Sequence, residues 1–380
     1  MSSVLDVLAN MLKANGEASQ PVAYYAPLVM LDANGKYFNP GGGLGLQGGD
    51  VSTGNPTYTG IYIHEMGHAL GLQHAGEAYD IGQFPYLWGN LNGSAWGYDS
   101  NKQEFLAPFV ASSSKSYGHC ATDIFAGHAR AIDSMGRCIK QDPMQSGDGD
   151  QASGYAFATF SDYSTAVMQR HLEGVTNVNS DGTHSYIGGK FSPDASFPSG
   201  YKRWDTAYAK WINVDTSTQK GGIFGLDQGT PQQTGVAVHA IGITISNAGT
   251  AGATQIYPPI DYVGNLMRTI DPTTAADRAL ITPNTGTYYW FCQSGGCDYT
   301  VRMTYVDGTQ RYALIQGGFR PFNQPTGTPA STTQDPLNAA SQQTWFVNMP
   351  GTVAISKIEL LSTPQVWSGM PANPQVLAQR

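Results

Sequence analysis

The chain has 380 residues, of which 41% are hydrophobic and only 13% are charged, with a formal net charge of −8. The charged share is about half the ~25% of ordinary globular domains, and small polar residues replace it, as is typical of extracellular, β-rich proteins. The negative charge argues against nucleic acid or an anionic membrane as a partner, and no run of eighteen apolar residues predicts a membrane span.

The N-terminal stretch MSSVLDVLANMLKANGEASQ predicts a short amphipathic helix. Leu5, Leu8 and Leu12 fall on one face of a helix over Val4 to Ala14. The stretch has neither the basic start nor the continuous apolar core of a signal peptide. If the protein is secreted, we expect its targeting segment to be missing from this chain.

The next segment is β-prone and then rich in glycine. Val22 to Leu31 is apolar and ends at an Asp-Ala-Asn-Gly turn, and GGGLGLQGGD follows at Gly41 to Asp50. No Gly-Lys-Ser/Thr follows, so a phosphate-binding loop is a poor interpretation. An extended segment against which another backbone can lie closely fits better.

Three helices are predicted in the middle of the chain. The first covers Thr59 to Leu72, with Gly71 at its end where a left-handed cap would lie. Between Ala75 and Gln141 the pattern is weak, and we expect one helix around Thr122 to Met135. The third begins at Ser161 or Asp162 and runs to Glu173, before Gly174.

Residues 176–380 change character and show short apolar or alternating runs separated by turn signals such as Asp307-Gly308. This pattern predicts a mainly antiparallel, sandwich-like β module. The expected strands are Val236 to Ser246, Tyr299 to Tyr305, Arg311 to Ile315, Trp345 to Val347 and Val353 to Leu361.

The four cysteines form two close couples, Cys120 with Cys138 and Cys292 with Cys297. Pairing within each couple would give two local disulfides, as expected of a secreted protein. Free buried thiols are the alternative. A zinc site is less favoured, because neither couple has CxxC spacing.

The stretch HEMGHALGLQH, from His64 to His74, carries the most information. On a helix, His64 and His68 lie one turn apart and can point two imidazoles at one metal ion. Gly71 lets the chain turn so that His74 can supply a third nitrogen. Three protein ligands leave a position open, which is typical of a catalytic zinc site. Glu65 is placed to take a proton from the attacking water.

This extended motif resembles that of the metzincins, a clan of zinc peptidases with a methionine-containing turn beneath the metal. Two candidates for that turn exist, Met135 and Met144. We favour Met144, because a polar, turn-forming stretch and the Ser161 helix follow it. Met135 fits better in the last turn of the helix expected before it. Such a methionine packs under the site and is not a ligand.

Within the clan, the chain resembles the StcE- and TagA-type secreted bacterial proteases that cut mucin-like, O-glycosylated proteins. The likeness covers about residues 40–175 and extends loosely into the β half. Besides the zinc motif, the stretches that carry it are Ser94 to Asp99, Phe105 to Phe109, Phe125 to His128, Phe157 to Glu173 and IYPPIDYVGNLM.

The chain also departs from the pattern of this family. An insertion with Cys138 separates the Phe125 region from Met144. Phe160 stands where a tyrosine is expected before the last helix, and Tyr163 follows three residues later, so a tyrosine role in the transition state is in doubt. Ala75 follows the third histidine, unlike the glutamate of astacins.

Trp96, Tyr98 and Tyr163 are candidate substrate-binding residues, although aromatic residues in long loops more often pack into small cores. The stretch Ser146 to Asp150 superficially resembles a calcium loop but lacks the ligand series, so a solvated turn is favoured. The remaining histidines are interpreted as surface or core residues: His119, His128, His171, His184 and His239.

The resemblance implies an α+β fold. A metzincin-like zinc protease domain at residues 1–175, with a small mixed sheet, an active-site helix and a C-terminal helix, would precede a β-rich module at residues 176–380. It implies one catalytic Zn²⁺ and a secreted, monomeric endopeptidase acting on O-glycosylated proteins. The alternatives are a glycan- or mucin-binding adhesin with incidental hydrolysis and a metzincin indifferent to glycans.

Overall fold

The computed structural model of the chain describes residues 1–94, 97–101, 103–155, 158–216, 226–293, 295–324 and 333–380. The chain divides into two compact units. Unit 1 contains Met1–Leu8 and Pro21–Asn213, and unit 2 contains Ala9–Gln20 and Val214–Arg380. The fold is a mixed α+β fold, rich in strands and with few helices, as predicted. Among the described residues, no helix is long and apolar enough to cross a membrane.

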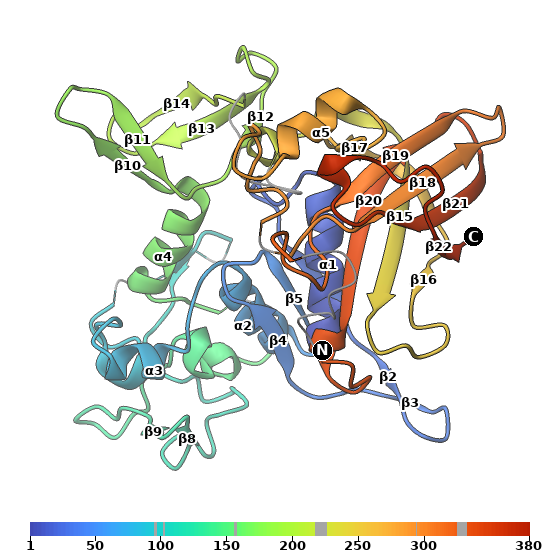
Figure 1. The fold of residues 1–380 in the computed structure, drawn as a ribbon. Helices are drawn as coiled ribbons and strands as arrows, with labels where there is room; N and C mark the ends of the chain where they lie inside the picture. Colours follow the sequence, from blue (N-terminus) through green and yellow to red (C-terminus); the bar gives the residue numbers. More distant parts are fainter. Residues whose placement is uncertain (95–96, 102, 156–157, 217–225, 294, 325–332) are drawn as a thin grey trace. The chain divides into compact units, whose positions relative to one another are not determined.

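Unit 1 contains a small mixed sheet. Strand β5 (Val51–Gly54) is central and buried, with β1 (Tyr24–Pro27) parallel on one side and β4 (Gly43–Leu46) antiparallel on the other. The glycine-rich segment therefore forms an edge strand. Helix α2 (Thr59–Ala69) packs against β4 and β5 (Figure 1).

Three further helices are formed by residues outside this small sheet and α2. Helix α1 (Ser2–Ala14) confirms the amphipathic N-terminal helix, with Leu5 and Leu12 buried. Helix α3 (Ala75–Asp80) follows the third histidine, and α5 (Ala275–Ile281) belongs to unit 2.

Helix α4 (Asp162–Glu173) confirms the third predicted helix. The Ser161 hydroxyl accepts a hydrogen bond from the Ser164 backbone N–H, which caps the N-terminus. Gly174 ends the helix at φ +76°.

The helix expected around Thr122 to Met135 is wrong. A two-stranded hairpin stands there, made of β8 (Ile124–Phe125) and β9 (His128–Ala129). Its two turn residues, Ala126 and Gly127, have φ of +48° and +82°. Positive φ at both turn residues is the geometry of a tight hairpin and is incompatible with a helix.

The rest of unit 1 consists of short strands and single helical turns. The hairpins are β2 (Met30–Leu31) with β3 (Tyr37–Phe38), β6 (Tyr98–Asp99) with β7 (Glu104–Phe105), and β10 (Val175–Val178) with β11 (His184–Ile187). A three-stranded sheet orders β12 (Ser192–Pro193), β13 (Tyr201–Asp205) and β14 (Lys210–Asn213). The 3-10 turns include Leu87–Gly89, Pro143–Gln145 and Gly147–Gly149.

Strands β10 to β14 fall within unit 1 because residues 175–213 pack with the preceding part of the chain. Lys190, for example, pairs with the buried Asp50 beside β5. The compact units thus divide near residue 213. The predicted boundary at residue 175 is that of the protease domain, which need not coincide with the boundary of a compact unit, and it stays a prediction.

Unit 2 is antiparallel, and its strands match the predicted runs closely. One sheet contains β15 (Gln233–Ser246), flanked by β16 (Gln255–Ile256) and β17 (Ile260–Leu266) on one edge and by β20 (Gln342–Pro350) on the other. The second orders β19 (Gln310–Ile315), β18 (Tyr299–Tyr305), β21 (Ile355–Ser362) and β22 (Val376–Gln379).

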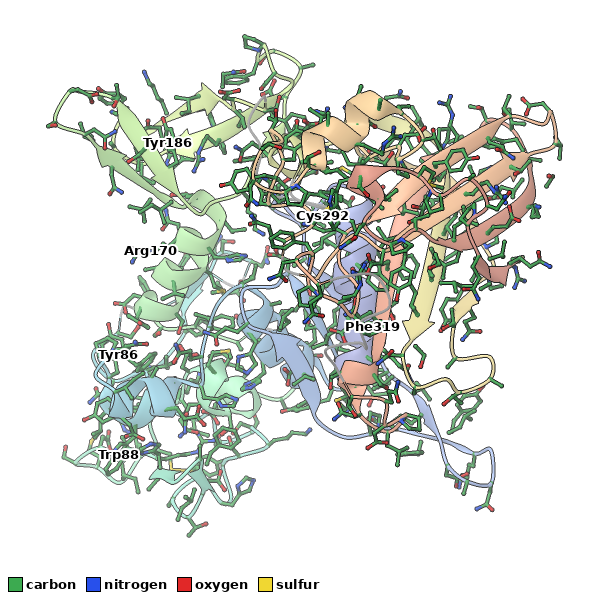
Figure 2. The ribbon with its side chains drawn as sticks, in the orientation of Figure 1. Tyr86, Trp88, Arg170, Tyr186, Cys292 and Phe319 are labelled. Carbon is green, nitrogen blue, oxygen red and sulfur yellow. A yellow bond between two sulfur atoms is a disulfide. The ribbon has the colours of Figure 1, made fainter. Side chains whose placement is uncertain are left out.

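Both sheets of unit 2 contribute side chains to one continuous apolar core, including Ile243, Val301 and Leu360. Cys292 and Phe319, labelled in Figure 2, belong to this core. Cys292 is bonded to Cys297, and Cys120 of unit 1 is bonded to Cys138. Both predicted disulfides are therefore present.

Candidate active site

Helix α2 and the turn after it bring three histidines together. His64 and His68 lie one turn apart on α2, which ends at Ala69. Gly71, at φ +99°, reverses the chain, and its N–H donates to the His68 carbonyl at 2.8 Å. The next three residues return toward the helix and place His74 opposite the other two rings.

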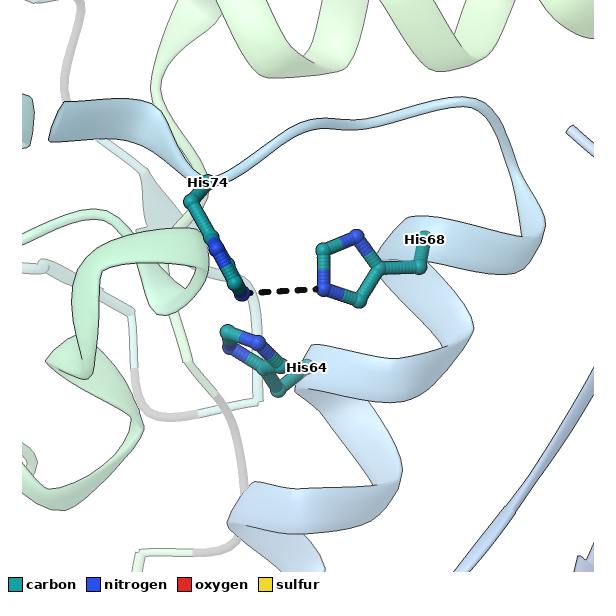
Figure 3. A group of neighbouring side chains, drawn as sticks. All are labelled: His64, His68 and His74. Atoms are coloured by element: carbon teal, nitrogen blue, oxygen red, sulfur yellow. Dashed lines mark hydrogen bonds between the residues drawn. The ribbon is translucent and has the colours of Figure 1, made fainter. Parts of the chain in front are cut away.

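The three imidazoles converge on one point (Figure 3). One ring nitrogen from each of His64, His68 and His74 lies within 4.8 Å of the others, and the Nε2 atoms of His68 and His74 are 3.3 Å apart. Two ring nitrogens that both carry a lone pair repel each other at this distance unless a proton or a metal cation lies between them. The cluster can therefore bind a metal ion.

Hydrogen bonds to backbone carbonyl oxygens orient the rings of His64 and His68. Nδ1 of His64 lies 2.8 Å from the Pro143 carbonyl oxygen, and Nδ1 of His68 lies 2.8 Å from the Leu72 carbonyl oxygen. A carbonyl can only accept, so each Nδ1 carries the proton and each Nε2 keeps its lone pair. This is the outer arrangement that metal-binding histidines normally show.

His74 has a carboxylate in the corresponding place. Its Nδ1 lies 3.4 Å from Oε1 of Glu77, three residues later on α3. The sequence analysis did not single out Glu77. An acidic residue at i+3 from a ligand on a helix was the available signal.

The electrostatics of the cluster favour neutral imidazoles. Burial lowers the pKa of His64 to about 4, the hydrogen bond to Pro143 opposes that shift, and His68 and His74 add to it. Burial also lowers the pKa of His68. Since only a neutral imidazole has a lone pair to donate, both groups are in the metal-binding form at neutral pH.

Glu65 lies beside the cluster and outside it. It is only 6% exposed, and burial raises its pKa to about 7, against the opposing effect of a hydrogen bond from the Gly45 backbone. A carboxyl group with this pKa can accept and return a proton near neutral pH.

The glycines of β4 allow this edge strand to approach α2. A Cβ atom at Gly43 would lie 2.5 Å from Cγ of Glu65, and one at Gly45 would lie 2.4 Å from the Glu65 carbonyl oxygen. Neither position has room for a side chain. The sequence predicted an extended glycine-rich segment against which another backbone can lie closely, and β4 packed on α2 has this arrangement.

Strand β4 and the three ligands enclose an open cleft of about 410 Å³. The histidines and Glu65 form its floor. Its other lining residues are Gly43, Leu44, Gly45, Gln47, Gln73 and Glu77.

Met144 lies directly under α2. It is fully buried, and a Cβ atom at Gly67 would lie 2.3 Å from its sulfur. Pro143, the residue before it, is the one whose carbonyl orients His64. Met135 is 67% exposed in a turn of the chain and not in the last turn of a helix, so the expectation for it is wrong. Met144 as the structural methionine of the site stays our prediction.

Tyr98 and Tyr163, two of the candidate substrate-binding residues, are not among the described residues that line the cleft. Tyr163 packs edge-on against Phe84, with ring centroids 5.3 Å apart, in a small apolar cluster. Tyr98 packs edge-on against Phe105 and is 54% exposed. Trp96 lies outside the described residues. Substrate binding by these three side chains stays a prediction.

The remaining histidines each pair with an aspartate instead of joining the cluster. These pairs are His119–Asp123, His128–Asp80, His171–Asp50, His184–Asp205 and His239–Asp261.

Three oriented imidazoles, a neighbouring carboxyl group and an open cleft are the features of a metal-dependent hydrolase site. In agreement, residues 1–176 match the family described as Peptidase M66. M66 peptidases are metallopeptidases, and a peptidase acts on a protein substrate.

The whole chain is similar to proteins named dictomallein. It is 48% identical to Dictomallein of Burkholderia pseudomallei (strain 668), 47% identical to that of Burkholderia mallei (strain ATCC 23344), and 40% identical to Dictomallein-3 of Dictyostelium discoideum, each over all 380 residues. The chain covers 52% of the two bacterial proteins and 60% of the third. The similarity to these proteins extends over all 380 residues, whereas the match to Peptidase M66 covers residues 1–176.

Proposed function

We propose that this chain is the catalytic part of a secreted zinc endopeptidase that cleaves mucin-like, O-glycosylated proteins. His64, His68 and His74 hold the Zn²⁺, and Glu65 is the general base. The observation that carries the proposal is the convergence of one ring nitrogen from each histidine, while Nδ1 of His64 and of His68 is hydrogen-bonded to a carbonyl oxygen and Nδ1 of His74 lies 3.4 Å from Glu77. A neutral three-nitrogen set suits zinc.

When bound, Zn²⁺ supplies a Lewis acid that polarises the scissile carbonyl and acidifies the attacking water. Glu65 takes the proton of that water and returns it to the departing amine. Its raised pKa places both transfers near neutral pH. Glu77 holds the His74 ring in place during this sequence.

The substrate backbone adds antiparallel to the edge strand β4, which pairs with β5 on its other side. The glycines of β4 bring this edge beside Glu65, so the peptide bond lies over the ligands. Residues 1–175 carry this chemistry, and residues 176–380 form an accessory β-rich module of a monomeric protein.

The preference for O-glycosylated substrates rests on sequence resemblance, and the two disulfides fit an oxidising, extracellular compartment. A glycan-binding adhesin is the alternative from another class. The buried Glu65 disfavours it, because metal binding alone needs no carboxyl group there.

The proposal is tested with the Glu65→Gln variant, which keeps the size of the side chain but cannot act as a base. We expect zinc content to be unchanged and hydrolysis to fall by a factor of about 10²–10⁴. Intact turnover in this variant would exclude Glu65 as the base.

The substrate class is tested by digesting a mucin, its deglycosylated form and casein, with and without a chelator. Cleavage of the glycosylated form alone supports the proposal. Equal cleavage of casein indicates a protease indifferent to glycans, and binding to mucin without cleavage indicates an adhesin.

A further inference from the structure

Unit 1 contains a second cleft that shares no residue with the histidine site. Its volume is about 320 Å³, and most of its walls are apolar. The lining residues are Phe105, Leu106, Ala107, Phe109, Val110, Ala111, Lys140, Gln151, Ala152 and Tyr155.

Lys140 is the one charged side chain among the described residues that line this cleft. The residue is only 5% exposed, and its ammonium group donates one hydrogen bond to Oε1 of Gln151, at 3.0 Å. An ammonium group has three donors. Within the described part of the chain, Gln151 is its only hydrogen-bond acceptor, and it has no carboxylate in ion-pair contact.

Asp150, whose charge acts on Lys140, already accepts three other hydrogen bonds. Its Oδ2 accepts from Arg130 at 2.6 Å and from the Gln141 backbone N–H at 2.9 Å, and its Oδ1 accepts from the Ser116 hydroxyl at 2.6 Å. Asp150 attracts Lys140 electrostatically, but burial prevails and lowers the pKa of Lys140. A buried cation without a bonded counter-ion is costly, so the cleft is complementary to an anion.

The side chains that line the cleft indicate the chemistry of the part of a ligand that does not contact Lys140. Phe105 is 71% exposed at the cleft, and Val110 is buried behind it. The guanidinium of Arg137 covers the Phe109 ring at 3.6 Å but is neutralised by Asp133 at 2.7 Å. An apolar body of about the size of one aromatic ring with a short chain would bury these rings and keep water from the ammonium.

We propose that this cleft binds a small apolar carboxylic acid, whose carboxylate pairs with Nζ of Lys140 and whose apolar body lies against Phe105 and Phe109. The Gln151 amide holds the ammonium in position. A charge-assisted hydrogen bond in an apolar site gives the carboxylate a large advantage over a neutral group of the same shape. Neither the metal nor Glu65 takes part.

The test uses the full chain with two probes of equal shape, 3-phenylpropionate and 3-phenylpropan-1-ol, measured by calorimetric titration. We expect the acid to bind at least about ten times more tightly than the alcohol. Equal affinity of the two probes, or no binding of the acid, overturns the proposal.

Two variants locate the binding. Lys140→Met keeps the length of the side chain without its charge and should abolish the preference for the acid, whereas Lys140→Arg should retain it. Ala107→Trp fills the cleft and should block both probes, which provides a test even if the Lys140 variants fold poorly. Acid binding that persists in Ala107→Trp and Lys140→Met places the ligand elsewhere and contradicts the proposal.

Discussion

The two units have interiors of different kinds. Unit 2 is built around one large apolar cluster with many fully buried side chains, such as Ile241, Ile243 and Phe291. In unit 1 the buried apolar clusters are small, and one of them consists of Val110, Cys120 and Cys138 alone. Buried polar groups occupy much of the interior around the histidine site, among them Asp142 and Gln145.

The two kinds of interior have different structural effects. Apolar packing stabilises but orients loosely, whereas buried hydrogen bonds fix direction. Gln145 accepts from the Gly76 N–H at 2.6 Å and donates to the Phe125 carbonyl at 2.9 Å. It thereby joins the helix after His74 to the β8–β9 hairpin. In unit 1 buried hydrogen bonds position the side chains of the site, whereas in unit 2 apolar packing mainly stabilises the unit itself.

The largest effect is expected at the polar centre of unit 1. Asp142 is fully buried and accepts from the Met144 N–H, the Ser161 N–H and the Ser164 hydroxyl, at 2.8–2.9 Å. Asp142→Ala leaves these donors unsatisfied and should destabilise unit 1 by about 4 kcal/mol. Calorimetry measures the change, and hydrogen exchange should place it around the metal site. Asp181→Ala, at an exposed turn, is the control and should have little effect.

The matching change in unit 2 is Ile243→Ala, at a side chain with no exposure. Loss of packing should destabilise unit 2 by about 3 kcal/mol. Val263→Ala, at a 73% exposed position of the same sheet, should have little effect. Peptidase activity measured while unit 1 remains folded should be unchanged. A loss of activity without unfolding of unit 1 would contradict the division of labour between the units.

The two disulfides sharpen the comparison, because they close loops of different length. Cys120 and Cys138 are 18 residues apart, and Cys292 and Cys297 are 5 apart. Chain entropy predicts that replacing the first pair with alanines costs about 3 kcal/mol and the second about 2 kcal/mol. Denaturant unfolding of the two double variants measures this order. The opposite order would mean that packing in the unit 2 core outweighs loop closure.

The smallest expected effect is the pH dependence of the stability of unit 1. Burial raises the pKa of Glu65 to about 7, above its usual value in the unfolded chain. The folded state then holds its proton more tightly, so the metal-free protein loses stability as the pH rises from about 4.5 to about 7. The difference between the two pKa values corresponds to about 3 kcal/mol. Because Glu65 borders an open cleft, solvent screening should reduce the stability advantage of Glu65→Gln above pH 7 to about 2 kcal/mol. Equal pH profiles of wild type and variant would show that Glu65 titrates normally.

Much of the fold could be predicted because local signals and tertiary packing agree. The periodicity of α1, the serine cap and terminal glycine of α4, and the alternating runs of unit 2 all specify the observed elements. His64 and His68 could be predicted because the spacing of residues on a helix fixes their geometry, and His74 because Gly71 lets the chain turn back toward the helix.

The failures lie where long-range contacts decide the structure. Around Phe125 the apolar spacing suggested a helix, but the hairpin is held by Gln145 and by the His128–Asp80 pair, which come from distant parts of the chain. The roles of Asp142 and Lys140 were likewise invisible, because a single polar residue gives no sign of its burial until its surroundings are known.

Residues 9–20 carry a consequence for biosynthesis. The Asn15 side chain bonds to Asn265 and to Asn348, and the second contact spans 333 residues. A ribosome therefore adds Asn15 to the chain 333 residues before it adds Asn348. Until β20 has been synthesised, the C-terminal end of α1 lacks its final contacts and is accessible to chaperones and proteases.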